Sequence, residues 1–436
     1  MRQDSSLTVR SIHMNITELL EGKRNCDCGM AHLCPIDSVV IEKNACLKLP
    51  SLTENHQNIL LVADENTYAV CGKQVDEILS ERITARVIFH RNGLLVPDEE
   101  AIAEIESALT KDCDLIIGVG SGVINDLCKI VSFKAGLRYY IVATAPSMDG
   151  YASKGSALIL DGMKVTLNAN VPAAIIADVD VLANAPFDMI AAGYGDIIGK
   201  YSCLNDWQLS ALVNGEYLCE YVMNATYDTV NATVSLADGI RARNADAIGA
   251  LMEALVAVGI LMAYVGNSRP ASGSEHHLSH YFEIVGIERG EDYLAHGIDV
   301  CFSAVETAKL REKLLAIQDI SAYSYQFDRE DYESNVRRIY GSVADEVLAL
   351  QDKMGWYKID RVSVYKEKWA DICEILAKAP SSAEMLALCE KVGLNYNDYL
   401  SLYGEKKIAD ALLYAKDLKD RYTVLWTYYD LTASTK

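Results

Sequence analysis

The feature that most constrains this chain is an alternation, between about residues 38 and 182, of short apolar runs with segments of helical periodicity. The runs at 58–64 (NILLVAD), 114–120 (DLIIGVG) and 173–178 (AAIIAD) have the length of strands and are apolar at almost every position. Continuous apolar runs of this length are typical of strands that are buried on both faces. The alternation therefore predicts a parallel sheet that helices cover on both sides.

After about residue 184 the pattern changes to long helical periodicity, which continues almost to the C-terminus, as at 245–266. A chain of 436 residues is long enough for two or three domains with sizeable cores. We therefore expect an N-terminal extension at residues 1–37, an α/β domain at 38–183 and an all-α domain at 184–436.

The formal net charge of −21 argues against nucleic acid and anionic membranes as partners, because both require clustered cations. It also means that local features must hold any ligand that bears a phosphate, since the global field opposes its binding. The sequence has no uninterrupted apolar run of about 18 residues, so we expect no transmembrane helix. Residues 1–17 are polar and lack the apolar stretch of a signal peptide.

Twelve cysteines are scattered along the chain, and most lie inside apolar periodic segments, where cysteine behaves as a small hydrophobe. A reducing cytoplasm is therefore the expected location. Cys26, Cys28, His32 and Cys34 lie closer together, in the order C-x-C-x₃-H-x-C. This spacing matches no common zinc finger, so we favour an ordinary reduced surface segment, with a structural metal site as the alternative.

A glycine-rich turn, Gly118-Val-Gly120-Ser121-Gly122, follows one predicted strand and precedes a predicted helix. Glycines at this position let the backbone approach a pyrophosphate, whose charge is met by free N–H groups and the helix dipole. The spacing is not the usual G-x-G-x-x-G, and a purely structural tight turn explains it equally well. Asp64, at the end of the preceding predicted strand, is suited to bind an adenosine ribose or to cap the next turn.

Four of the eight histidines, His276, His277, His280 and His296, fall within one short window. Residues 272–274 (SGS) are good N-cap residues, so the first three histidines are expected in the first turns of a helix, and His296 begins the next helical run. Asp196, which we expect at the start of the first long helix after the sheet, would supply a carboxylate. Two histidines and one aspartate with open positions are typical of a catalytic metal site, whereas silent histidines are the alternative.

Several strings resemble the iron-type, or polyol, alcohol dehydrogenase superfamily, and within it the glycerol 1-phosphate dehydrogenase branch. The strings are GVGSGVINDLCK (118–129), ATAPSMDGYASKGSAL (143–158), AAIIADVDVLANAP (173–186), AAGYGDIIGKYSCLNDWQLS (191–210), RPASGSEHHLSH (269–280) and AHGIDV (295–300). The SMDG, DWQLS and SGSEH strings resemble the phosphoglycerol branch in particular. The resemblance implies the dehydroquinate synthase-like, iron-type alcohol dehydrogenase fold: an α/β dinucleotide-binding domain and an all-α C-terminal domain.

The resemblance also implies the site residues. Asp196, His276 and His296 match the ligands of one divalent metal ion, which is zinc, nickel or iron in this superfamily. His277 ranks below His276, because relatives carry an apolar residue there. Asp149 matches a catalytic residue at the junction of cofactor and substrate. The residues that match the NAD(H) site are Asp64 at the ribose, Gly120, Ser121 and Gly122 at the pyrophosphate, and Thr144, Ser147 and Ser153 along the nicotinamide.

The implied reaction is the reversible reduction of dihydroxyacetone phosphate to sn-glycerol 1-phosphate by a cytoplasmic homo-oligomer. Lys164, Lys200 and Arg269 are candidates for holding the substrate phosphate. A dehydrogenase of a non-phosphorylated polyol and a dehydroquinate synthase-like cyclase are the alternatives. A nucleotide-binding protein without catalysis is disfavoured, because all three ligand positions are filled.

Overall fold

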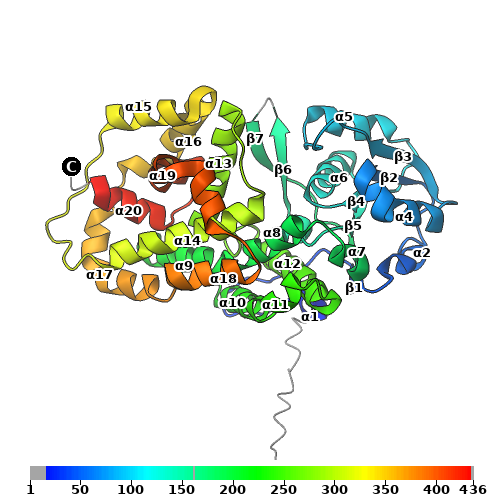
Figure 1. The fold of residues 1–436 in the computed structure, drawn as a ribbon, viewed down its shortest axis with the longest axis horizontal. Coiled ribbons are helices and arrows are strands. Elements are labelled where there is room, and N and C mark those ends of the chain that lie inside the picture. The colour runs from blue at the N-terminus through cyan, green and yellow to red at the C-terminus, as the bar shows by residue number, and fades with distance from the viewer. Residues whose placement is uncertain (1–15, 161–162, 434–436) are drawn as a thin grey trace, which may run out of the picture.

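A six-stranded parallel sheet forms the N-terminal half of the protein, as the alternating apolar runs predicted (Figure 1). The structure, a computed structural model, describes residues 16–160 and 163–433. In spatial order the strands are β1 (Ser38–Glu42), β8 (Ala174–Asp178), β5 (Arg138–Ala143), β4 (Leu115–Gly120), β2 (Ile59–Asp64) and β3 (Ile83–Phe89).

Successive residues of the strands enter two different apolar cores. Leu60 and Ile116 face the side on which α5 (Glu99–Ala108) and α6 (Gly122–Ala135) pack, and this core continues into the helical half of the chain. Leu61 and Ile117 face a smaller core on the opposite side, which short helices between residues 45 and 78 cover. Burial on both faces explains why the strands read as continuous apolar runs.

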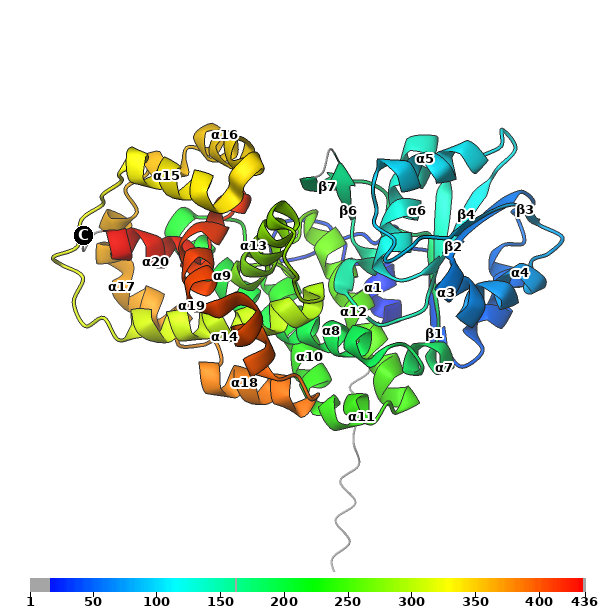
Figure 2. The ribbon, with the colours of Figure 1, turned by 45° about the horizontal axis from the view of Figure 1, so that its top comes forward.

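A hairpin of β6 (Gly155–Leu160) and β7 (Met163–Asn168) stands apart from the main sheet. The residues between the two strands, Asp161 and Gly162, lie outside the described residues. In both views the hairpin lies between the α/β half and the helical half (Figures 1 and 2). It can therefore contribute to a site between them.

The chain after β8 is helical, so the predicted combination of an α/β half and a helical half is confirmed (Figure 2). Short helices α1 (Ile16–Glu21), α3 (Glu65–Thr67) and α7 (Val179–Ala183) precede the helical half. Its helices are α8 (Phe187–Ile198), α9 (Lys200–Asn214), α10 (Glu220–Ser235), α11 (Ala237–Arg241), α12 (Ala245–Val265), α13 (Ser274–Arg289), α14 (His296–Leu315), α15 (Arg329–Tyr340), α16 (Ala344–Met354), α17 (Val362–Leu376), α18 (Ser382–Lys391), α19 (Tyr396–Tyr414) and α20 (Val424–Ala433).

Helix α12 is the one described helix that is long and apolar enough to cross a membrane, judged by length and composition alone. However, 83% of its apolar window is buried inside the protein. The helix packs against α10, α7 and the turn at Asp149–Ala152. Burial of this kind is the behaviour of a core helix.

Helices α8 and α14 touch through their backbones. A Cβ added to Gly195 would collide with the carbonyl oxygen of Gly297 and lie 2.9 Å from Cys301 Cβ, and one added to Gly297 would collide with Ala192 O. Only glycine permits this approach, because any other residue places a carbon atom where the partner helix already has one. The contact brings the last turn of α8 against the first turn of α14.

The substitution Gly195→Ala is expected to separate α8 from α14 and to lower the free energy of unfolding. Overpacking a tight core costs about 1–3 kcal/mol, which a urea titration would measure. Gly249→Ala on α12 is the matched control, since its Cβ would lie 3.1 Å from Val179 Cγ1, a side-chain methyl that can shift. Equal losses of stability in the two variants would contradict a requirement for backbone contact between α8 and α14.

Candidate active site

Three side chains from three helices converge where α8 meets α14. Asp196 lies in the last turn of α8, His276 in the first turn of α13, and His296 is the first residue of α14. Their ligand atoms all lie within 4.8 Å of one another. The structure thus brings together the three residues that the sequence selected. The expectation that Asp196 begins its helix was wrong, because α8 already starts at Phe187.

The two imidazoles are oriented by neighbours that bind their Nδ1 atoms. Glu275 Oε1 lies 2.7 Å from His276 Nδ1, and Ser279 Oγ lies 3.2 Å from His296 Nδ1. His276 Nε2 then faces Asp196 Oδ1 at 3.5 Å. Partners of this kind on the far ring nitrogen are typical of histidines that bind a metal, because they fix the tautomer and the ring orientation. The donor set therefore fits a divalent cation.

A buried ion-pair network adjoins these ligands. Lys200 Nζ lies 2.6 Å from Asp196 Oδ1 and 2.7 Å from Asp149 Oδ2, and the Asp149 N–H donates to Asp196 Oδ2 at 2.9 Å. Burial raises the pKa of Asp196, but Lys200 and His276 outweigh it and hold that pKa below its ordinary value. Burial and the charge of Asp196 together raise the pKa of Asp149. Asp196 is therefore the carboxylate that stays charged and can bind a cation.

The two other histidines of the window occupy different surroundings. The ring of His280 is centred 5.5 Å from that of His296, so it lies beside the three converging residues. His277 is fully buried, and neither of its ring nitrogens has a hydrogen-bond partner among the described residues. Burial, followed by the nearby cations Lys419 and Arg421, lowers its pKa well below the ordinary value, so His277 is neutral. Of the two adjacent histidines, only His276 joins Asp196 and His296.

A cavity of about 430 Å³ opens beside these residues, between the carboxyl ends of the strands and the helical half. Its walls come from α6, the loop after β5, the β6–β7 hairpin, the end of α12 and the first turns of α13 and α14. The lining includes Gly122, Asp149, Ser153, His276, His296 and Lys419. A crevice outside the carboxyl ends of parallel strands is the usual ligand site in a fold of this class.

Gly122, the last residue of the glycine turn, lines this cavity. β4 ends at Gly120, and Ser121 precedes α6 without using its side chain as a cap of the helix. The N–H of Thr144, just after β5, donates to Gly120 O at 3.1 Å. Free N–H groups at the start of a 14-residue helix suit a pyrophosphate, as the glycine pattern suggested.

Asp64 ends β2 and caps the following turn. Its Oδ1 accepts hydrogen bonds from the backbone N–H groups of Asn66, at 2.8 Å, and Thr67, at 2.9 Å. The capping role left open by the sequence is thus present. Asp64 also stands at the carboxyl end of the strand next to β4, so a role at the ribose remains a prediction.

The loop that carries Ser147, Asp149 and Ser153 is held to α6 by a buried lysine. Lys129 Nζ donates to Gly150 O at 3.0 Å and to Gly155 O at 2.7 Å, and it lies 3.4 Å from Ser153 Oγ. Ser147, half-buried, precedes the turn at Asp149–Ala152. The sequence pattern by itself indicated no role for Lys129. Its contacts show that it positions the loop.

The comparisons with known proteins agree with this architecture. Residues 40–186 match a family model described as iron-containing alcohol dehydrogenase. Glycerol-1-phosphate dehydrogenase [NAD(P)+] of Halalkalibacterium halodurans is 36% identical over 305 residues, which cover 67% of this chain and 76% of the relative. The protein of the same name from Bacillus licheniformis is 32% identical over 345 residues, which cover 76% of this chain and 86% of that relative. The chain belongs to the glycerol-1-phosphate dehydrogenase family.

Solved structures show the fold of this glycerol-1-phosphate dehydrogenase family member in more distant proteins. An iron-containing alcohol dehydrogenase from Thermococcus thioreducens superposes with a TM-score of 0.58 at 13% identity, covering 90% of this chain and 98% of that one. Sulfoacetaldehyde reductase from Bifidobacterium kashiwanohense, solved in complex with NAD+, superposes with a TM-score of 0.57 at 14% identity. The match covers 93% of this chain and 99% of that one. At these identities the likeness shows the fold alone, and it is the iron-type alcohol dehydrogenase fold that the motifs implied.

The sequence missed two cations of this family member, one that lines the cavity and one that contacts residues of its wall. Lys419 lines it and lies 3.4 Å from Ser272 Oγ, while Arg421 donates to Ser272 O at 2.5 Å and to Ser268 Oγ at 3.0 Å. Burial, followed by the nearby Arg269, lowers the pKa of Arg421 to about 10, so it remains a cation at neutral pH. These residues precede α20 and are 147 or more positions from their partners, and no local pattern links them.

The cations that the sequence proposed for the substrate phosphate have other surroundings. Lys200 pairs with two carboxylates, as described above. Arg269 pairs with Glu216 and donates to Tyr422 O at 2.7 Å. The side chain of Lys164 lies outside the described part of the chain. Lys419, which lines the cavity, is therefore better placed than Lys200 and Arg269.

Asp196→Asn, His276→Ala and His296→Ala are each expected to lose the metal of this site, because two ligands should not hold an ion that three bind in an open site. Metal content measured by mass spectrometry after dialysis would check this. His280→Ala is the matched control and should keep the ion. Loss of metal in His280→Ala, with retention in His296→Ala, would make the assignment of the second imidazole wrong.

Proposed function

We propose that this protein is a metal-dependent, NAD(H)-linked dehydrogenase that reduces dihydroxyacetone phosphate to sn-glycerol 1-phosphate, reversibly. One observation carries the proposal: the two histidines of the Asp–His–His cluster, the first residues of α6 and the Lys419 cation all line one cavity. A metal, a dinucleotide and a phosphate could thus meet within it. Membership of the glycerol-1-phosphate dehydrogenase family supports the same reaction.

Asp196, His276 and His296 would hold the metal ion, with Glu275 and Ser279 orienting the two imidazoles. A divalent ion bound there, zinc, nickel or iron, would polarise the C2 carbonyl and stabilise negative charge on its oxygen during hydride transfer. The three ligands leave coordination positions open for substrate, as in catalytic rather than structural sites.

The dinucleotide would lie across the carboxyl ends of β2, β4 and β5. Gly120, Ser121 and Gly122 would approach the pyrophosphate, since their backbone lies at the start of α6. Thr144, Ser147 and Ser153 lie between β5 and β6 and would face the nicotinamide, and Ser153 lines the cavity. At the other end of the cofactor, Asp64 would accept hydrogen bonds from the ribose.

Asp149 would stand between cofactor and substrate. It lines the cavity, its N–H is bound by Asp196 and its carboxyl group by Lys200. These two contacts fix the turn next to the metal ligands, so Asp149 can orient a substrate hydroxyl without itself binding the ion. Lys129 holds the same loop at Gly150, next to Asp149, and at Gly155, where β6 begins.

The substrate phosphate would be bound by Lys419, with Arg421 behind it. A net charge of −21 repels a dianion at long range, so binding depends on cations at the site. Arg421 anchors Ser268 and Ser272, both of which line the cavity. This group of cations favours a phosphorylated substrate over a neutral polyol, the first alternative. The second alternative, a dehydroquinate synthase-like cyclase, would show no net change in NADH, so an assay of NADH consumption distinguishes it from a dehydrogenase.

None of the twelve cysteines, all of them among the described residues, forms a disulfide, which supports a reducing compartment such as the cytoplasm. We expect the functional unit to be a homo-oligomer, with a small phosphorylated ketone or polyol as its ligand and neither nucleic acid nor membrane as a partner. Gel filtration with light scattering would measure the size of that oligomer.

Unaltered enzyme is expected to prefer NADH over NADPH, because a 2′-phosphate would approach the charge of Asp64. Asp64→Ser should narrow the difference in kcat/KM by on the order of 1–3 kcal/mol. Serine can still accept from the N–H of Thr67, so the cap is retained while the charge is lost. Asp98→Ser, which alters the equivalent cap of α5, is the control and should leave the preference unchanged. Equal use of both cofactors by the unaltered enzyme would remove Asp64 from the site.

Dihydroxyacetone phosphate is expected to be reduced at least about a hundredfold more efficiently than dihydroxyacetone, roughly 2.7 kcal/mol of differential transition-state binding. Lys419→Gln should lower kcat/KM for the phosphorylated ketone and leave the neutral ketone nearly unaffected, which makes the neutral ketone the internal control. A stereospecific sn-glycerol 3-phosphate dehydrogenase should fail to oxidise the product. Comparable rates on both ketones with the unaltered enzyme would favour a general polyol dehydrogenase.

A further inference from the structure

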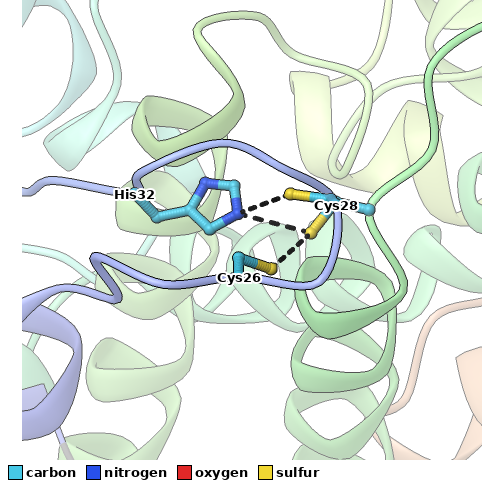
Figure 3. Close-up of side chains that lie close together, drawn as sticks. Cys26, Cys28 and His32 are labelled. Atoms are coloured by element: carbon cyan, nitrogen blue, oxygen red, sulfur yellow. Dashed lines mark hydrogen bonds between the residues drawn. The ribbon is translucent and has the colours of Figure 1, made fainter.

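A second cluster of metal-binding side chains lies in the N-terminal segment, and none of its residues lines the cavity. Cys26, Cys28 and His32 point toward one another across a short hairpin, in which Lys23 and His32 exchange backbone hydrogen bonds at 2.8 Å (Figure 3). Cys219, the residue before α10, completes the group. One ligand atom from each residue lies within 4.8 Å of all the others.

Cys219 takes the place that Cys34 holds in the sequence pattern. Cys34 lies two positions beyond His32 and does not belong to the group. Cys219 is 187 residues from His32 in the chain, so no spacing rule could have selected it. The local pattern C-x-C-x₃-H therefore supplies three ligands, and the tertiary structure supplies the fourth.

The distances between these atoms fit the edges of a tetrahedron around one ion. Sγ of Cys26 and Sγ of Cys219 lie 3.7 Å apart, and His32 Nε2 lies 3.4 Å from Sγ of Cys28 and of Cys219. Bonds of about 2.3 Å to sulfur and about 2.0 Å to nitrogen at tetrahedral angles give edges of about 3.8 and 3.5 Å. A disulfide would need sulfur atoms about 2.05 Å apart, so the two cysteines are not bonded to each other.

The surroundings prepare His32 and Cys28 to act as ligands. His32 Nδ1 lies 3.1 Å from Tyr264 O, so the ring donates its N–H there and directs the lone pair of Nε2 at the thiols. The ring is fully buried and stacks on Tyr264, with centroids 5.3 Å apart. The hydroxyl of Tyr217 donates to Cys28 Sγ at 3.1 Å, which favours a thiolate.

We propose that Cys26, Cys28, His32 and Cys219 bind a structural zinc ion, distinct from the metal of the active site. Three sulfur ligands and one nitrogen close the coordination sphere, as in structural rather than catalytic zinc sites. The ion joins the N-terminal segment to the start of α10 and, through the carbonyl of Tyr264, to the last turn of α12. Met262 and Ala263, in that turn, line the cavity, so the zinc site stabilises one of its walls.

Metal analysis of the purified full-length protein tests the proposal without any assay of activity. Unaltered protein should contain two metal equivalents per chain, of which Cys219→Ser loses one and His276→Ala loses the other. Cys34→Ser is the matched control, since it removes a thiol of the same segment outside the cluster, and it should keep both. Cys219→Ser should also lower the melting temperature. Equal metal content in Cys219→Ser and the unaltered protein would overturn the proposal.

Cobalt(II) provides a second test that does not depend on the folding of Cys219→Ser. His276→Ala protein, with the four cluster residues intact, is stripped of metal and loaded with cobalt(II) alone. Thiolate ligands should give a sulfur-to-cobalt charge-transfer band and the intense visible absorption of a tetrahedral ion. Absence of the charge-transfer band, or a Cys26–Cys219 disulfide in peptides from freshly purified protein, would overturn the proposal. Because neither readout involves ketone reduction, failure of the proposed catalytic function would leave this result unaffected.

Discussion

The backbone contact between α8 and α14 is the constraint on which the rest of the site depends. Gly195 and Gly297 let the two helices approach until carbonyl oxygens occupy the space that a Cβ would need. Asp196 and His296 are the neighbours of these glycines in sequence, so the same contact that packs the helices brings two ligands together. Asp206 positions the start of α13, which carries His276, because its carboxylate accepts a hydrogen bond from the N–H of Ser274 at 2.7 Å.

Buried charged groups connect several helices of this strongly acidic protein, and Asp206 is the example nearest the site. Asp206 also accepts from Arg311 at 2.9 Å and from the N–H of Val424 at 3.0 Å, and it thereby ties α9, α13 and α14 to the start of α20. The segment just before α20 carries Lys419, which lines the cavity, and Arg421, which donates to Ser268 and Ser272 of its wall. One buried carboxylate thus positions both the helix that bears His276 and the cations proposed for the phosphate. Burial without partners would be costly for every one of these charges.

Much of the fold and part of the site could be predicted from local sequence. Continuous apolar runs gave the buried parallel strands, and the residues of the SGSEHH string place His276 at the start of a helix. The position of Asp196 within α8 was misjudged, because the sequence around Gly193 and Gly195 resembles a helix start although the helix begins earlier, at Phe187. Two glycines in a helix signalled close packing and not a boundary.

The sequence by itself determined features of short range. These are the periodicity of strands and helices, the glycine turn before α6, and the position of the histidines next to the N-cap residues of their helix. These depend on contacts within a few residues, which spacing records directly. Only the tertiary structure decided that Lys419 lines the cavity beside Ser272, and that Cys219 rather than Cys34 joins His32. Both pairs lie more than a hundred residues apart in the chain. Contacts of that kind arise from the packing of whole helices, which side-chain spacing along the chain does not encode.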